Sequence, residues 1–316
     1  MATLPATLPG IAAPRGARPG RRRAAAAGPF SQRPASCRAV ARRLAGVLAA
    51  GPAPRPGSAS ADPPRRRMRH PLRRTRPAAP RPVAYWPALE GRQLAVFGNI
   101  HGRDDLLAAA LARLDARAVP GAARPTEIYL GDLIDYGPDS RGVIARLLAR
   151  AQSREVIALR GDHEALLLRA LSDDAALRAW LARRGGEATL RSYRCPIAAG
   201  TGWEAATRAL LRAALPPAHL AFLRRMPVSF SLGALYFVHA GIRPGRLIAD
   251  QDEGDLLTIT EPFLSSRRNH GLLVVHAHSP VPEPEFRLNR INLDTGAVVT
   301  GRLTGLLISD RAIEFV

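Results

Sequence analysis

The 316-residue sequence contains no lysine, so all 46 of its basic side chains are arginines, against 26 acidic side chains and a formal net charge of +20. This charge is unevenly placed. Residues 1–92 hold 19 arginines and only two acidic residues, Asp62 and Glu90, whereas residues 93–316 hold 27 arginines and 24 acidic residues. Most of the net positive charge therefore lies in the N-terminal segment. The remainder is nearly neutral, so its charge does not indicate a nucleic-acid-binding domain.

Cysteine is also scarce, since Cys37 and Cys195 are the two in the chain. Two cysteines exclude a disulfide scaffold and any cysteine-rich zinc module, and they favour a reducing, cytoplasmic compartment. No stretch approaches ~18 uninterrupted apolar residues, so the sequence predicts no membrane span.

Residues 1–82 consist largely of Ala, Pro, Gly and Arg, with Phe30 as their only aromatic residue. Such a segment cannot bury enough apolar surface to offset its chain entropy, so we expect a disordered tail. Its arginines would bind polyanions, such as nucleic acid or a membrane surface, without specificity. Two alternatives stay open: a targeting segment, with a signal-like stretch at 41–61, or an extension upstream of a true start at Met68.

From residue 93 the pattern changes to short apolar runs that are each followed by helical periodicity, which is typical of βαβ units. Strands are predicted at 94–97, 128–130 and 156–159. A helix follows each strand: the first is capped by Asp104, the second spans 140–151 and the third begins at Glu164. Consecutive units of this kind place parallel strands side by side through right-handed crossovers.

The second half of the chain predicts further elements. Helices are expected at 177–184 and 217–225, bridged by the glycine-rich stretch 185–202, and strands at 235–238, 272–275, 291–293, 303–309 and 312–316. The sequence therefore predicts an α/β domain over residues 93–316, in which mixed β-sheets are flanked by helices.

Polar residues that can bind a metal follow the predicted strands. They are Asn99, His101, Asp132, Asp135, Asp162, His163, Glu164, His239, His276 and His278. Loops that leave the carboxyl ends of strands in an open α/β sheet meet in one crevice. Oxygen and imidazole donors in this mixture suit two divalent ions such as Mn, Fe or Zn.

These loops resemble the motifs of the bacterial serine/threonine phosphatases of the PPP family, which belong to the calcineurin-like metallophosphoesterase superfamily. The matching stretches are 98–102, 131–135, 161–164, 239–241 and 278–279, with further likeness at 137–144, 242–245 and 291–296. Motifs in isolation would be weak signals, but five in order are strong. The resemblance covers about residues 93–316 and implies a metallophosphoesterase-type layered sandwich.

The resemblance also implies a role for each residue. Asn99, His101 and Asp132 would hold one ion, and Asp132, Asp162, His239 and His278 would hold the second, with manganese expected and iron or zinc as alternatives. A water that bridges the ions would attack phosphorus in line. His163 would protonate the leaving oxygen and Asp135 would orient it. Glu164 is expected to be structural, and His276 is a less suitable ligand than His278.

Four positions depart from the family motifs. Asn99 stands where the family has Asp, and Asp162 where it has Asn. Tyr136 and Thr260 stand where the family has arginines that bind phosphate. Because the guanidinium fork matches phosphoryl oxygens, these losses predict reduced activity. Arg243 is a candidate replacement, and a structural salt bridge is the alternative role for it.

The primary hypothesis is a serine/threonine-phosphatase-type phosphoesterase that acts on a phosphoprotein, a phosphopeptide or a small phosphoester. Two alternatives follow from the same residues. One is a pseudophosphatase that binds phosphorylated partners without turnover, and the other is a dinucleotide polyphosphate hydrolase.

Overall fold

The computed structural model describes residues 89–118, 123–183 and 185–316. The tail expected at 1–82 lies outside these residues. Within them, no helix is long and apolar enough to cross a membrane, as the sequence predicted.

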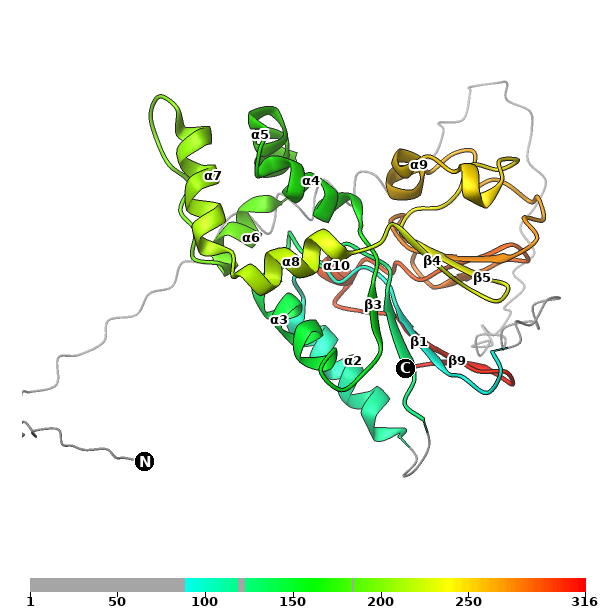
Figure 1. Ribbon diagram of the computed structural model, residues 1–316. Helices are drawn as coiled ribbons and strands as arrows, with labels where there is room; N and C mark the ends of the chain where they lie inside the picture. The colour runs from blue at the N-terminus through cyan, green and yellow to red at the C-terminus, as the bar shows by residue number, and fades with distance from the viewer. Residues whose placement is uncertain (1–88, 119–122, 184) are drawn as a thin grey trace, which may run out of the picture. The chain divides into compact units, whose positions relative to one another are not determined.

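Two mixed β-sheets form the centre of the fold (Figure 1). Sheet 1 has the strand order β10-β9-β1-β2-β3, and sheet 2 has the order β4-β5-β6-β8-β7. Sheet 1 consists of β1 (Leu94–Phe97), β2 (Thr126–Tyr129), β3 (Val156–Ala158), β9 (Gly305–Ile308) and β10 (Ile313–Phe315). Sheet 2 consists of β4 (Ser229–Leu232), β5 (Leu235–Val238), β6 (Leu273–His276), β7 (Glu285–Phe286) and β8 (Arg290–Asn292).

The parallel pairs lie at the centre of each sheet. In sheet 1, β1 pairs with β2 and β2 with β3 in parallel, which confirms the crossovers predicted from the sequence. In sheet 2, β5 pairs with β6 and β6 with β8 in parallel. The carboxyl ends of several strands therefore point the same way within each sheet, and loops of both sheets can supply one site.

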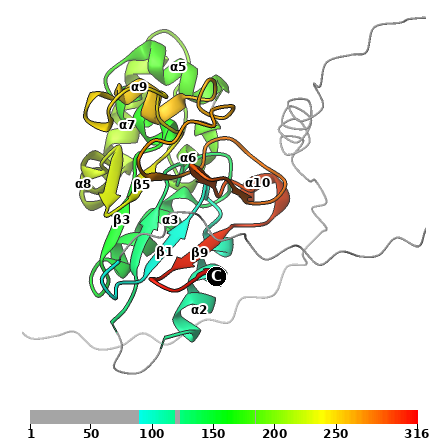
Figure 2. The ribbon, with the colours of Figure 1, turned by 90° about the vertical axis from the view of Figure 1, so that its right-hand side faces the viewer.

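The helices flank the sheets and fill the connections. They are α2 (Asp104–Ala116), α3 (Ser140–Arg150), α4 (Asp162–Ala170), α5 (Asp174–Arg183), α6 (Gly186–Ser192), α7 (Trp203–Ala214), α8 (Pro217–Arg225), the 3₁₀ turn η1 (Ile248–Asp250), α9 (Glu253–Thr258) and α10 (Ala297–Thr300). Helices α4 to α8 follow β3 in the chain and form a helical group next to α3 (Figure 1). Figure 2 shows α5 to α8 of this group from the side.

Alternating side chains of the strands divide the core into layers. Leu94 and Val96 of β1 pack against Phe237 of β5 and Val275 of β6, so one face of each sheet is buried against the other. The opposite face of sheet 1 packs on α2, α3 and the helical group, where Phe97 lies among helix residues such as Leu107. The outer face of sheet 2 is covered by α9 and the segment that follows it. The period of two in a strand makes this division possible.

The α/β class and the order of the main strands are confirmed, and the corrections are local. Asp104 is the first residue of α2 instead of its cap, because Arg103 occupies the N-cap position. Helix α4 begins at Asp162, two residues before the predicted start, with the backbone of Gly161 as its N-cap. The stretch 185–202 was expected to be a bridge, yet it contains α6. Helices α7, α9 and α10 and strands β4 and β7 were not among the predicted elements.

Candidate functional site

The five loops that the sequence singled out come together at the carboxyl ends of β1, β2, β3, β5 and β6. Two groups of candidate metal donors result, each with its donor atoms within 4.8 Å of one another: Asp132, Asp162, His239 and His278, and His101, Asp132 and His163. Below, cluster A is Asn99, His101 and Asp132, and cluster B is Asp132, Asp162, His239 and His278. Asp132 belongs to both.

The backbone of these loops is strained. His101, Asp132, Asp135, Tyr136 and His278 have φ angles of 48°, 50°, 73°, 60° and 63°. Such left-handed conformations are uncommon for residues other than glycine and cost about 1–3 kcal/mol each where the surrounding structure imposes them. Hydrogen bonds between the loops hold them in place, such as that from the amide of His101 to the carbonyl of Asp132 at 2.8 Å. Concentrated strain of this kind is characteristic of functional sites.

Glu164 joins the second and third loops. Its carboxylate accepts the backbone amides of Asp132 at 3.0 Å, Leu133 at 2.8 Å, Ile134 at 3.3 Å and Gly161 at 2.9 Å. Burial and the charge of Asp132 raise the pKa of Glu164 to about 7, against the lowering effect of the Gly161 amide. This placement supports the structural role expected for Glu164.

Gly161 allows the third loop to approach Asp132 closely. A Cβ atom at this position would lie 2.2 Å from Oδ1 of Asp132 and 2.5 Å from its backbone nitrogen. No side chain fits there without displacing the central carboxylate, so this glycine is a requirement of the site.

Cluster B is a compact set of two carboxylates and two imidazoles. His239 Nε2 lies 3.3 Å from both Asp132 Oδ1 and Asp162 Oδ1. His278 Nδ1 lies 3.1 Å from His239 Nε2 and 3.3 Å from Asp162 Oδ1. His239 Nδ1 donates to the carbonyl of Leu130 at 2.7 Å. This bond fixes the tautomer and leaves Nε2 facing the cluster, as metal-binding histidines require.

The charges of cluster B stabilise one another in the metal-free protein. Burial would raise the pKa of Asp132 and Asp162, but the neighbouring histidines lower both well below their usual range. Burial would lower the pKa of His239, but Asp132 and Asp162 outweigh it and raise that pKa well above its usual value. His239 is therefore protonated at neutral pH when no metal competes for its nitrogen.

Cluster A contains one carboxylate, one imidazole and one amide. His101 Nε2 lies 3.5 Å from Asp132 Oδ2, and Asn99 Nδ2 lies 3.1 Å from the same oxygen and 3.4 Å from His101 Nε2. His101 Nδ1 donates to the carbonyl of Ile134 at 3.0 Å, so its Nε2 faces Asp132. Asp132 thus directs Oδ2 to cluster A and Oδ1 to cluster B, which is the arrangement of a bridging ligand.

The spacing of these donors fits divalent ions. Ligands that each lie about 2.1 Å from an ion are about 3.0–3.4 Å apart at right or tetrahedral angles, and the distances above fall in or near this range. Asn99 Oδ1 is buried without a hydrogen-bond partner among the described residues. Because the two ends of an asparagine amide exchange by a simple flip, Asn99 can turn this oxygen toward cluster A. The residues present therefore fit two divalent ions.

His163 and Asp135 form a buried acid–carboxylate pair beside cluster A. His163 Nδ1 donates to Asp135 Oδ2 at 2.8 Å. Burial lowers the pKa of His163, but Asp132 and Asp135 outweigh it and raise that pKa to about 9. The ring of His163 lies 4.8 Å from that of His101, measured between centroids. A protonated imidazole at this place can donate a proton to an oxygen bound beside the clusters.

The carboxylate of Asp135 has two further partners that no sequence motif indicated. Trp180 Nε1 donates to Asp135 Oδ2 at 2.8 Å, and Thr189 Oγ1 donates to Asp135 Oδ1 at 2.6 Å. They stand 45 and 54 residues further along the chain, on α5 and α6. Their spacing carried no local signal, since only the packing of the helical group brings them to the loop.

Asp294 is a third residue that the sequence patterns did not place in the site, although the stretch 291–296 resembles a family motif. It is 1% exposed, and its Oδ2 accepts Asn99 Nδ2 at 3.3 Å. Its Oδ1 accepts the amide of Gly296 at 2.9 Å. Burial and the charge of Asp132 raise the pKa of Asp294 to about 6, against the lowering effect of the Gly296 amide. A sixth loop, after β8, therefore reaches cluster A.

Of the three candidate substrate-binding residues, Tyr136 lies beside cluster A and Arg243 is paired with a carboxylate. Tyr136 lies at the site, with its ring 5.1 Å from the ring centroids of both His101 and His163. Arg243 forms a bidentate ion pair with Asp255, with two bonds of 2.6 Å. Its guanidinium fork is thus engaged by a carboxylate, as the salt-bridge alternative predicted. Thr260 is exposed in the turn after α9.

His276 lies apart from the donors. It is fully buried, its Nδ1 lies 3.0 Å from the carbonyl of Ala277, and its ring packs edge-on against Phe263. His278, two residues later, is the histidine that joins cluster B, which agrees with the preference stated from the sequence.

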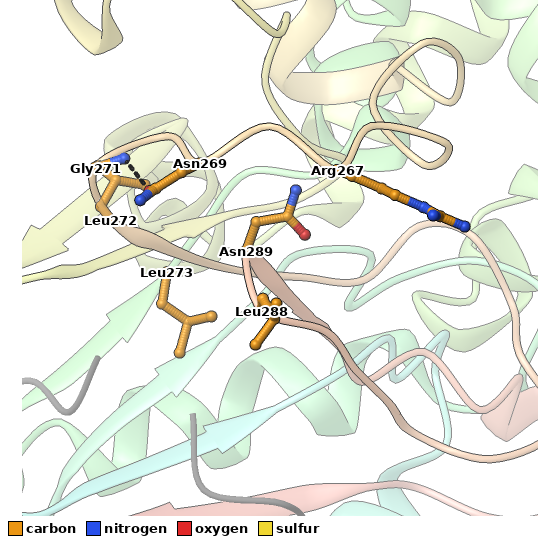
Figure 3. A pocket seen from close by; sticks show the side chains of 7 residues that line it. All are labelled: Arg267, Asn269, Gly271, Leu272, Leu273, Leu288 and Asn289. Atoms are coloured by element: carbon orange, nitrogen blue, oxygen red, sulfur yellow. Dashed lines mark hydrogen bonds between the residues drawn. The ribbon is translucent and has the colours of Figure 1, made fainter. Parts of the chain in front are cut away.

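A hollow of about 300 Å³ lies elsewhere in sheet 2 (Figure 3). It is lined by Arg267, Asn269, Gly271, Leu272, Leu273, Leu288 and Asn289. These residues precede or begin β6 and β8, so the hollow is at the amino ends of strands whose carboxyl ends lead to His278 and Asp294. It is therefore separate from the donor clusters.

Comparison with known proteins agrees with this geometry. Residues 93–301 match the family model of the calcineurin-like phosphoesterases. The chain belongs to this family. A relative from Anoxybacillus flavithermus, named bis(5'-nucleosyl)-tetraphosphatase PrpE (asymmetrical), is 28% identical over 67% of this chain and 88% of its own length. A protein of the same name from Oceanobacillus iheyensis is 24% identical over 71% and 91% of the two chains.

A solved structure supports the same fold for this calcineurin-like phosphoesterase. It is the crystal structure of a provisionally assigned diadenosine tetraphosphatase, which is 23% identical, covers 73% of this chain and 95% of its own, and has a TM-score of 0.52. The layered α/β fold and the superfamily expected from the sequence are thus established.

Proposed function

We propose that this protein is a metal-dependent hydrolase whose substrate is a dinucleoside tetraphosphate, cleaved asymmetrically into a nucleoside monophosphate and a nucleoside triphosphate. The observation that carries the hydrolytic part is the division of the Asp132 oxygens between clusters A and B, beside the His163–Asp135 pair. The names of the two relatives, which match over most of their length, support the choice of substrate.

The chain's own residues would perform three tasks. The donors of clusters A and B would hold two divalent ions, which when bound supply Lewis acidity and an activated water. His163, protonated at neutral pH because its pKa is raised to about 9, would donate its proton to the leaving oxygen. Asp135 would hold the imidazole in the required orientation through Nδ1.

The substituted positions set the expected rate. Asn99 is a neutral donor, and Tyr136 lacks the bidentate fork of an arginine. With Arg243 already paired to Asp255, less positive charge faces the phosphoryl oxygens. Removal of one preorganised donor in other enzymes costs about 10²–10³ in rate, so we expect slow turnover. A pseudophosphatase is the limiting case of the same reasoning.

The test uses the full chain loaded with Mn²⁺. Diadenosine tetraphosphate, p-nitrophenyl phosphate and a phosphoserine peptide are compared as substrates, with His163→Gln as the inactive control. We expect diadenosine tetraphosphate to have the highest kcat/KM of the three substrates and to give AMP and ATP in equal amounts. Two molecules of ADP would contradict asymmetric cleavage. Binding of diadenosine tetraphosphate without any product would favour the pseudophosphatase.

A serine/threonine protein phosphatase is the second candidate. It is supported by the run at 137–144, which resembles the protein phosphatase branch of the family. In the same assay it predicts the highest kcat/KM for the phosphoserine peptide, with release of inorganic phosphate.

A further inference from the structure

We propose that Trp180 and Thr189 are positioning residues for the general acid: they hold the carboxylate of Asp135, and through it the imidazole of His163, in the orientation that protonates a leaving oxygen. The inference rests on the proposed hydrolytic function. It assigns a role in the chemistry to α5 and α6, the part of the helical group that carries these two side chains.

The contacts account for both oxygens of Asp135. Trp180 Nε1 donates to Oδ2 at 2.8 Å, the same oxygen that accepts His163 Nδ1 at 2.8 Å. Thr189 Oγ1 donates to Oδ1 at 2.6 Å and accepts the backbone amide of Asp135 at 3.0 Å. One hydroxyl thus binds the side chain and the backbone of the same residue, and the plane of the carboxylate is fixed from both ends.

Burial makes the loss of any of these hydrogen bonds costly in free energy. Asp135, Trp180 and Thr189 are each 0% exposed. In such surroundings a buried polar group that loses its partner keeps the full cost of desolvation, about 1–3 kcal/mol. Asp135 also has the left-handed φ of 73°. A carboxylate on a strained backbone keeps one orientation only while its partners impose it.

Two glycines at the start of α6, Gly185 and Gly186, allow close contact with two aromatic rings of the site. A Cβ atom at Gly185 would lie 2.4 Å from the ring of Tyr136, and one at Gly186 would lie 2.5 Å from the ring of Trp180. Glycine at both positions lets the chain lie against both rings. The start of α6 is therefore held between Tyr136, beside cluster A, and Trp180, which contacts Asp135.

This arrangement predicts a specific defect when the bonds are removed. His163 would keep Asp135 as its partner, but the direction of its Nε2 would vary. Esters with a strongly basic leaving group depend on protonation most. Loss of positioning should therefore slow phenyl phosphate more than p-nitrophenyl phosphate, whose leaving group is a weaker base.

The experiment compares Trp180→Phe and Thr189→Val with the parent chain at saturating Mn²⁺. Thr189→Ser keeps the hydroxyl, and Trp203→Phe and Thr207→Val are matched controls on α7. For each variant, kcat and KM are measured with phenyl phosphate, p-nitrophenyl phosphate and diadenosine tetraphosphate, together with Mn²⁺ binding by calorimetry and the Tm.

We expect Trp180→Phe and Thr189→Val to lower kcat for phenyl phosphate about 10–100-fold, because general-acid catalysis contributes about 10²–10⁴-fold and loss of positioning removes part of it. The decrease should be smaller for p-nitrophenyl phosphate, with KM and Mn²⁺ binding unchanged. Thr189→Ser and both α7 controls should stay within about twofold of the parent.

Folded variants with unchanged kcat on every substrate that the parent cleaves would overturn the inference. So would equal losses on both aryl phosphates together with lost Mn²⁺ binding, because that pattern marks a structural role. If Trp180→Phe does not fold, the inference is tested by comparing kcat for phenyl phosphate between Thr189→Val and Thr189→Ser. A parent chain that loads Mn²⁺ and cleaves none of the three substrates refutes the proposed function itself, and the inference with it.

Discussion

Clusters A and B share Asp132 but differ in charge. Cluster B adds the carboxylate of Asp162 and two histidines, with neighbouring donor atoms 3.1–3.3 Å apart. Cluster A adds the neutral amide of Asn99 and a single histidine. Relative to the family motifs, one carboxylate has moved from cluster A to cluster B. The difference suggests that the two sites are unequal, with a tight ion in B and a weaker one in A.

The largest expected effect comes from removing the residue that both clusters share. Asp132→Ala should abolish the rise in Tm that Mn²⁺ produces, because metal stabilises a native state by mass action and neither cluster would retain its common ligand. Activity should fall to background. Thermal scans with and without Mn²⁺ measure the effect, with the exposed Asp250→Ala as control. A Tm that still rises by the parent's amount would show that the ions bind elsewhere.

The next effect removes the difference in affinity between the two sites. Asn99→Asp should tighten the first ion by about tenfold or more, and Asp162→Asn should loosen the second by a similar factor, because ligand charge count sets affinity for hard cations. Calorimetric Mn²⁺ titration should show two separate steps in the parent chain and converging steps in the double variant. Two equal steps already present in the parent would contradict the comparison.

Much of this site follows from local sequence patterns. Strands such as β1 and β5 have the predicted bounds, because short apolar runs bounded by glycine or polar residues are local signals. Donor residues directly after such strands must lie at one edge of a sheet. The sequence could therefore indicate that His101 and Asp132 lie close together, whereas His239 comes from sheet 2 and joins them because the two sheets pack face to face.

The remaining features depend on contacts between distant segments. Asp294 reaches Asn99 across 195 positions, and Thr189 reaches Asp135 across 54. The fork of Arg243 is occupied by Asp255, which no motif indicated. Glycines at 185 and 186 suggested a bridge because they interrupt helical periodicity, although α6 begins there. Tertiary packing decides each of these cases.

Asp294 supplies a carboxylate close to cluster A. Its carboxylate lies 3.3 Å from Asn99 and adds negative charge next to the otherwise charge-poor cluster A. Asp294→Asn removes this negative charge and should therefore weaken the first Mn²⁺ step about tenfold, a loss typical of changes around a metal ligand, and leave the second step unchanged. Calorimetry on this variant and on Asn99→Asp/Asp294→Asn, where affinity should recover, checks the claim. Unchanged binding in the single variant would exclude Asp294 from the site.

The smallest expected effect concerns protons. His239 has a pKa raised well above its usual value by Asp132 and Asp162 against the effect of burial, so an ion in cluster B must displace a proton at neutral pH. Burial lowers the pKa of His101 despite the charge of Asp132, so that imidazole is already neutral. Competition between the proton and Mn²⁺ for His239 weakens as the pH rises. The affinity of cluster B for Mn²⁺ should therefore increase about threefold from pH 7.0 to 7.5, while the affinity of cluster A for Mn²⁺ stays nearly constant.

Titrations in buffers of different ionisation enthalpy measure this directly, because the heat reports the protons released. About one proton should accompany the tight step and almost none the weak step. His239→Gln should remove the release from the tight step, since a glutamine carries no displaceable proton on this face. Equal release in both steps would show that His101 and His239 have similar pKa values, and the electrostatic difference between the clusters would then be lost.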